Sequence, residues 1–197
     1  MRYVVILFLF CISLQCVGVR KYNVEKVKNW PIEFNQNVDI QLYCRAGLWY
    51  KKLDVLSRCR TDVTDFYLNP ARDALREAKL KDSPSEKRLI IDIIDQYGPT
   101  PELSNLLGFF TLGLYPSISE DYLTVRIEVQ ANNRKVVGAV SKTETYITIQ
   151  ETLLIFAYPF LGDPVADRYP EIIYDLTKAA LVEIKERGLL EERIQKP

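Results

Sequence analysis

The feature that most constrains the fold is a run of strict alternation between apolar and polar residues that begins at Tyr122. Such a period of two is typical of a β-strand with one face buried and one face in solvent. The apolar residues that share one face are Leu123, Val125, Ile127 and Val129.

The alternation continues beyond Asn132-Asn133 as far as Val140, which predicts a β-hairpin. Asparagine tolerates positive φ and therefore suits a two-residue turn. If residue 131 faces residue 134, Val129 faces Val136, and the apolar face of the first strand continues in the second. The hairpin therefore presents one continuous apolar face to a core.

Two further strands and two helices are predicted around this hairpin. Residues 37–45 alternate and predict a strand with one buried face, whereas residues 89–94 are almost all apolar and predict a central strand covered on both faces. Asn69-Pro70 predicts the N-cap and first residue of a helix. A second helix is expected to begin at Asp167 or Tyr169 and to end at Arg187-Gly188, with Gly188 as a left-handed cap.

These elements predict one α+β domain over residues 37–188. Its order is strand, helix, strand, hairpin, helix, which gives a sheet of about four strands with two helices packed on one face. Residues 189–197 form a charged tail.

The N-terminus has the pattern of a secretory signal peptide over residues 1–15. Arg2 provides a positive charge, and residues 4–14 form an apolar run that is too short to cross a hydrocarbon core of about 30 Å. Cleavage before Cys16 would leave a cysteine for lipidation, with residues 16–36 as a tether to the membrane. Cleavage after Gly18 would instead release a secreted soluble binding protein.

Cys44 and Cys59 remain as a non-terminal pair after either cleavage. In an oxidising compartment they form either a disulfide or two separate buried thiols. Neither belongs to a Cys-x-x-Cys motif, so a redox-catalytic role has little support.

The chain contains no histidine, which excludes Ser-His-Asp and Cys-His nucleophiles and HExxH zinc sites. Lys+Arg and Asp+Glu are balanced at 26 each, so no basic field favours nucleic acid as a partner. We expect no cofactor and no metal, because Asp92 and Asp95 lack further ligands. A carboxylate-based hydrolase is the weaker alternative, and its candidate acids are Asp92, Asp95, Glu120, Asp121 and Asp163.

Two apolar segments, residues 106–116 and 151–161, flank the hairpin. Because the segments before and after a hairpin meet at the same end, we expect them to lie near each other. They pack in the core or form an exposed apolar lip that meets a lipid or a protein partner. The residues of this predicted apolar lip are Phe109, Phe110, Leu112, Phe156, Tyr158 and Phe160.

The element order over residues 37–188 resembles periplasmic lipoproteins with a TolB N-terminal-like α/β sandwich, including the lipopolysaccharide-assembly lipoprotein. The sequence around the expected cleavage site, with Ile12 at −4 from Cys16, is similar to the looser lipoboxes of spirochaete lipoproteins. These resemblances imply a cell-envelope address and no defined activity. The leader with Cys16, the tether and the two apolar segments predict a membrane-anchored lipoprotein, at the outer membrane or the periplasmic face, that carries palmitate on Cys16 and binds or assembles an envelope protein or lipid partner without catalysis.

Overall fold

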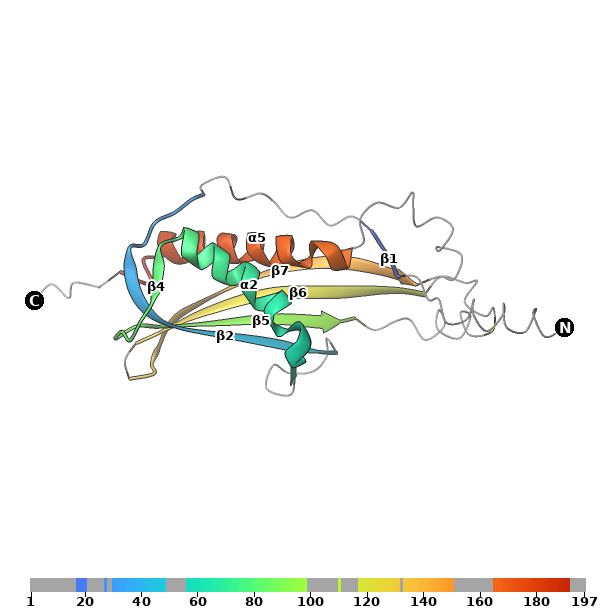
Figure 1. The fold of residues 1–197 in the computed structure, drawn as a ribbon, viewed down its shortest axis with the longest axis horizontal. Helices are drawn as coiled ribbons and strands as arrows, with labels where there is room; N and C mark the ends of the chain where they lie inside the picture. The colour runs from blue at the N-terminus through green and yellow to red at the C-terminus, as the bar shows by residue number, and fades with distance from the viewer. Residues whose placement is uncertain are drawn as a thin grey trace, which may run out of the picture.

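The computed structural model describes residues 17–20, 27, 30–48, 56–98, 110, 117–131, 133–150 and 165–191. In these residues a mixed β-sheet carries two helices, and both lie on the same face (Figure 1). The predicted class, α+β with two helices on one face, therefore agrees with the structure.

The sheet has seven strands rather than about four. The order is β1-β7-β6-β5-β2-β3, and β4 pairs with β2 outside this path. The four long strands are the predicted ones, and the three short strands are added at the edges. The strands are β1 (Val17–Arg20), β2 (Gln36–Leu48), β3 (Ser57–Arg58), β4 (Leu80–Asp82), β5 (Arg88–Tyr97), β6 (Ser117–Gln130) and β7 (Val136–Gln150).

The two helices are α2 (Thr61–Glu77) and α5 (Val165–Glu186). Helix α2 connects β2 to the parallel strand β5, through the short β4, as the strand-helix-strand order predicted. Strand β6 is antiparallel to both of its neighbours, β5 and β7. The core lies between the helices and the inner face of the sheet, where alternate residues of β5 and β6 are fully buried: Leu89, Ile91, Ile93, Leu123, Val125, Ile127 and Val129.

Strand β5 is buried on both faces, as its apolar sequence predicted, but helices cover only one of them (Figure 1). On the other face Ile94 is 6% and Asp92 7% exposed. Asp92 stands in register between Tyr43 of β2 and Arg126 of β6 and accepts a hydrogen bond from Arg45 Nε at 3.1 Å. On this face, long polar side chains of the neighbouring strands therefore cover β5, whereas helices cover it on the other face.

The hairpin forms with a different register from the predicted one. Val129 pairs with Gly138 rather than Val136, and a bulge lies between Val129 and Gln130. The loop is longer than two residues because Arg134 adopts a φ of 62° and its N–H bonds to Ala131 O at 2.8 Å. From Gly138 onward the shift is two residues, so these side chains keep their predicted face and the apolar face is preserved, whereas Val136 pairs with Gln130.

Helix α2 begins at Thr61, and the predicted start at Asn69-Pro70 is wrong. Pro70 lies inside the helix. The apolar stripe explains the longer helix, because Leu68 is buried one turn before Ala71 and two turns before Leu75, and all three lie at helical spacing on the same side.

Helix α5 begins at Val165, two residues before the earlier of its predicted starts, and ends as predicted. Gly188 has a φ of 61°. The N–H groups of Gly188 and Leu189 bond to the carbonyls of Lys185 and Ile184 at 3.0 and 3.1 Å, which is the Schellman pattern of helix termination.

Parts of the predicted tether over residues 16–36 lie on the domain. Val17–Arg20 form β1 and pair with Ile147–Gln150 of β7. Trp30, Ile32 and Phe34 are half-buried against the core. These three apolar residues stand at every second position and so share one face. This explains why a segment of largely polar composition packs against the core.

Cys44 and Cys59 form a disulfide, with their Cα atoms 5.4 Å apart. The bond joins β2 to the residue that follows β3, and the N–H of Cys59 also bonds to Cys44 O at 3.1 Å. The short strand β3 is therefore fastened to the sheet covalently and by backbone pairing.

Replacing both cysteines with alanine is expected to lower the free energy of unfolding by about 3 kcal/mol, because the 15-residue separation constrains the unfolded chain. Urea unfolding of the wild type and the double variant, each with and without a reductant, measures this. Reductant should lower the stability of the wild type and leave the double variant unchanged; equal sensitivity would contradict the prediction.

Candidate functional site

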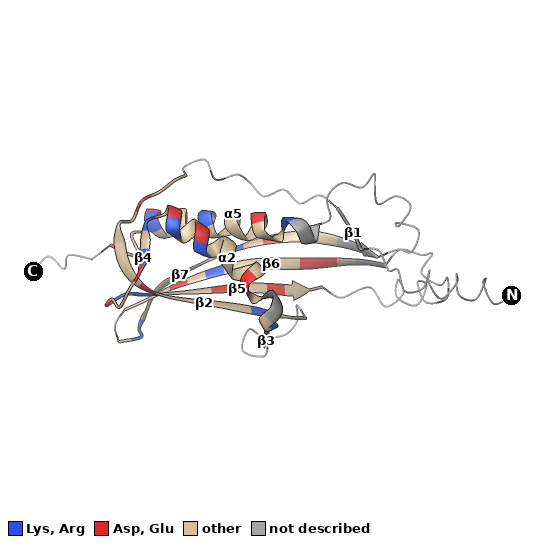
Figure 2. Cartoon of the chain, viewed as in Figure 1, with Lys and Arg blue, Asp and Glu red and all other residues tan. Residues whose placement is uncertain are grey.

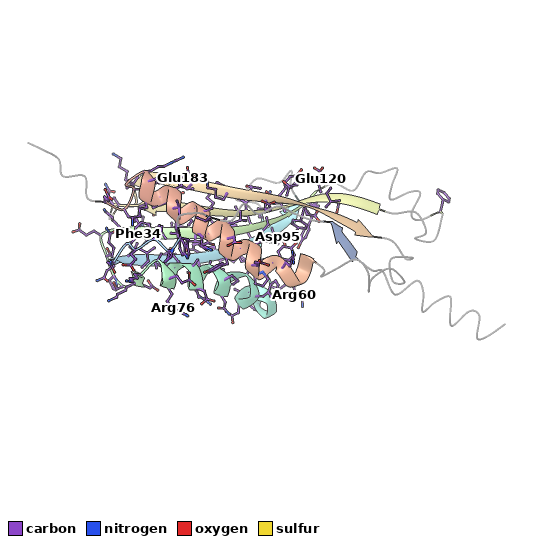
Figure 3. All side chains as sticks on the ribbon, turned by 90° about the horizontal axis from the view of Figure 1, so that it is seen from above. Phe34, Arg60, Arg76, Asp95, Glu120 and Glu183 are labelled. Carbon is purple, nitrogen blue, oxygen red and sulfur yellow. A yellow bond between two sulfur atoms is a disulfide. The ribbon has the colours of Figure 1, made fainter. Side chains whose placement is uncertain are left out.

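A cluster of polar side chains lies between the sheet and the first turns of both helices. We call it the aspartate–tyrosine cluster; its members are Asp95, Asp121, Tyr67, Tyr97, Tyr146 and Tyr169. Asp95 is 1% exposed and Asp121 5% exposed. Figure 3 shows Asp95 beside α5, in the same half of the molecule as Arg60 and Glu120.

Three tyrosine hydroxyls converge on the Asp95 carboxylate. Tyr67 donates to Oδ2 at 2.8 Å, Tyr146 to Oδ1 at 3.0 Å and Tyr97 to Oδ2 at 3.4 Å. Tyr146 also shares a short hydroxyl–hydroxyl hydrogen bond with Tyr169. A continuous path of hydroxyl groups therefore leads from the buried carboxylate to the start of α5.

The topology explains why these residues meet. Asp95 follows Ile91 and Ile93 on the inward face of β5, so strand periodicity directs it under the helices. Tyr146 pairs across β6–β7 with Asp121. The rings of Tyr67 on α2 and Tyr169 on α5 pack with centroids 5.9 Å apart.

Burial raises the pKa of Asp95 above its ordinary value, and the charge of Asp121 acts in the same direction. The hydrogen bonds from the tyrosines oppose this shift. Burial and the Asp95 charge raise the pKa of Tyr97 to about 12 and also raise the pKa values of Tyr67, Tyr146 and Tyr169. The four hydroxyls therefore stay protonated and serve as donors.

Asp121 accepts the N–H of Gly98 at 2.9 Å and the hydroxyl of Ser119 at 3.5 Å. Gly98 comes so close to β6 that a Cβ atom there would meet the Glu120 carbonyl oxygen at 1.6 Å. Only glycine lets the chain end β5 at this point with its N–H directed to Asp121.

The carboxylates named in the sequence fall in three different environments. Asp95 and Asp121 meet in the cluster, Asp92 lies on the opposite face of the sheet, and Glu120 is exposed. Asp163 lies outside the described residues. Within the described part of the chain, three or more potential metal ligands do not come together. The cluster can hold a proton and join five elements, β5, β6, β7, α2 and α5, and its carboxylates are occupied as hydrogen-bond acceptors.

Of the predicted apolar lip, the structure describes Phe110, which is 72% exposed. The other five residues and Cys16 lie outside the described residues. Ser117, the first residue of β6, pairs with Gln150, the last residue of β7. Among the described residues, no helix has the length and apolar character needed to cross a membrane.

A second feature, which sequence reasoning missed, is a surface groove of about 530 Å³ between α2 and α5. At its side Glu77 Oε2 accepts from Trp30 Nε1 at 2.7 Å and from the Tyr174 hydroxyl at 2.6 Å. The Lys178 ammonium lies 4.6 Å from the Tyr174 ring centroid. The available signal for this groove was helical spacing, which places Pro70 and Glu77 on one face of α2 and Pro170 and Tyr174 on one face of α5.

Positive and negative side chains are interspersed on both helices (Figure 2).

Comparisons with known proteins give distant structural likenesses. No protein-family model matches the sequence, and a search of curated proteins finds no relative. The rare lipoprotein B from Shewanella oneidensis is 13% identical, with 78% of this chain and 99% of that chain covered and a TM-score of 0.41. A PelC dodecamer from Paraburkholderia phytofirmans is 8% identical, with 84% and 96% covered and a TM-score of 0.32. At this overlap we base no argument on either likeness.

Replacing Asp95 with asparagine tests the buried charge. Since the pKa of Asp95 is raised on folding, its contribution to stability is complete below the ordinary pKa of an aspartate and is lost as pH rises through the folded value. The wild type minus Asp95→Asn difference in unfolding free energy should therefore fall as pH rises above about 4, the ordinary pKa of an aspartate. Urea unfolding across this range measures it, and a difference that increases with pH would show that folding favours the carboxylate.

Tyr146→Phe removes one donor to Asp95 and the link to Tyr169. We expect a loss of about 1–3 kcal/mol in unfolding free energy, because a buried carboxylate oxygen loses its partner. Tyr122→Phe is the matched control, since Tyr122 donates to the exposed Glu120 at 3.2 Å, and it should change stability little. Equal effects of the two substitutions in thermal unfolding would show that the cluster is energetically unimportant.

Proposed function

We propose that this chain is a lipid-anchored protein of the bacterial cell envelope, acylated at Cys16, that binds or assembles a partner without catalysis. The observation that carries the proposal is the position of β1, which begins at Val17, one residue after Cys16.

The two possible cleavage sites differ in what they do to this strand. Cleavage before Cys16 leaves all four β1–β7 residue pairs intact. Cleavage after Gly18 removes Val17 and Gly18, and with them half of the pairs, and leaves the rest at a free N-terminus. A short strand at a chain end with two pairs gains little from pairing, since chain ends fray unless they are tied down. Cleavage before Cys16, the site that a lipidating pathway would use, is therefore the one that preserves the pairing of β1.

The disulfide between Cys44 and Cys59 supports the exported address. Disulfides persist in oxidising compartments such as the bacterial periplasm and are rare in the reducing cytosol. This agrees with the signal-like pattern of residues 1–15.

A binding role without catalysis is supported by the state of the buried acids. The Asp95 and Asp121 carboxylates accept hydrogen bonds from tyrosine, serine and backbone donors. A glycosidase-type pair needs one acid open to substrate on each side of the scissile bond. The proposed partner is another envelope protein or a lipid, at the outer membrane or the periplasmic face.

The test is metabolic labelling with palmitate of the full precursor expressed in a bacterial host, followed by detergent phase partition. The wild type should carry label and enter the detergent phase, and Cys16→Ala should lose both. Cys11→Ala is the matched control, because Cys11 lies in the apolar part of the leader and leaves with it.

Two results would contradict the anchor. One is an unlabelled, water-soluble wild-type product that begins at Val19. The other is label that survives in the Cys16→Ala variant.

A further inference from the structure

The end of the sheet that adjoins Cys16 also exposes large apolar side chains. Leu48 at the end of β2 is 39% exposed, Tyr97 at the end of β5 is 44% exposed, and Phe66 on α2 is 42% exposed. We call these three residues the apolar rim. Leu48 pairs directly with Tyr97 in the β2–β5 register.

Phe66 belongs to the same end through its neighbours. Its ring contacts the Tyr67 ring with centroids 5.5 Å apart, and Tyr67 donates to Asp95, two residues before Tyr97. Phe110, at 72% exposure, lies in the connection that leaves β5 at this end and enters β6 at this end. The other exposed large hydrophobic residues of the described chain, Val136 and Val137, follow the hairpin loop at the opposite end.

We propose that the apolar rim contacts the lipid bilayer in which the acyl chains of Cys16 are embedded. This rests on the proposed function, because acylation of Cys16 is what brings the bilayer to this end. No tether separates the anchor from the sheet: Val17 already pairs with Gln150. Adjacent Cα atoms are about 3.8 Å apart, so the membrane surface lies within one or two residues' length of the start of β1.

The sheet geometry determines how the rim reaches the bilayer. Tyr97 is level with Asp121 and Tyr146, and Tyr146 is four residues from Gln150, which corresponds to about 13 Å along the strand. From β1 to β2 the sheet spans four strand spacings, or about 19 Å. A tilt of the strands by about 35° from the membrane normal therefore brings the anchor and the rim to the same plane.

In this orientation the hairpin loop points away from the membrane. Val137 is nine residues from Tyr146, or about 30 Å along β7, and at a tilt of about 35° this places it about 24 Å farther from the bilayer. The lipid-facing end is thus defined by exposed Leu48, Phe66 and Tyr97, and the distal end by exposed Val136 and Val137. Partial insertion of a few apolar side chains at the headgroup boundary adds to the membrane affinity that the acyl chains provide.

The chain offers a clean way to test this orientation. In the acylated mature protein Cys11 is removed, Cys16 is blocked, and Cys44 and Cys59 are joined, so an introduced cysteine is the free thiol. We would attach a nitroxide label to Phe66→Cys, to Leu48→Cys and to the control Val137→Cys. Each full-length acylated protein is reconstituted into phosphatidylcholine vesicles and floated.

The readout is collision of the nitroxide with oxygen, which concentrates in lipid, and with a water-soluble nickel complex. Labels at 48 and 66 should gain oxygen accessibility and lose nickel accessibility when vesicles are added, whereas the label at 137 should keep both. Two rim positions on different elements keep the test valid if one variant folds poorly.

The outcomes separate the two proposals. Protein that floats while labels at 48 and 66 remain open to nickel overturns the membrane-facing rim and leaves the lipid anchor intact. Protein that does not float and carries no acyl group overturns both. Loss of nickel accessibility at 137 but not at 48 or 66 would assign the membrane to the opposite end and overturn the inference.

Discussion

The structure depends on burial of the inner face of β5 between α2 and α5. Strand β5 pairs along its whole length with parallel β2 and antiparallel β6, so it joins the strand-helix-strand unit to the hairpin. Its inward residues Leu89, Ile91 and Ile93 are fully buried. Removing this apolar surface from water is the main favourable contribution to the free energy of folding. The apolar faces of both helices are directed toward this surface.

The same inward alternation that builds the core also positions the buried acid. Asp95 occupies the next inward position after Ile93, and its carboxylate would be costly to bury without partners. Three tyrosines from α2, β5 and β7 donate to it. The aspartate–tyrosine cluster therefore links the first turns of the helices to the end of the sheet, next to the apolar rim.

The two ends of the molecule differ in a way that fits attachment at one of them. One end holds strand β1, the ends of β2 and β5, and the starts of both helices. The other end holds the hairpin loop and the end of α5 (Figure 1).

The edges of the sheet are partly covered. Along its outer side β2 pairs with the short strands β4 and β3, and a disulfide fastens the residue after β3 to β2. On the opposite side of the sheet β1 covers only residues 147–150 of β7, and there inward-facing Lys142 of β7 pairs with Glu183 of α5 at 2.6 Å, which disfavours strand addition to the remaining edge of β7.

The sequence by itself determined the four long strands, the two helices and the Gly188 cap, because alternation, helical spacing and left-handed glycine are local signals. The tertiary structure alone decided the hairpin register and the start of α2. A two-residue slip keeps the side chains from Gly138 onward on their face, so the alternation of Ile127, Val129 and Val140 could not distinguish the registers. Pro70 is a local start signal that burial of Leu68 overrode. The meeting of Asp95 with Tyr67, Tyr146 and Tyr169 was also invisible, because residues up to about a hundred positions apart become neighbours only when strands pair and helices pack.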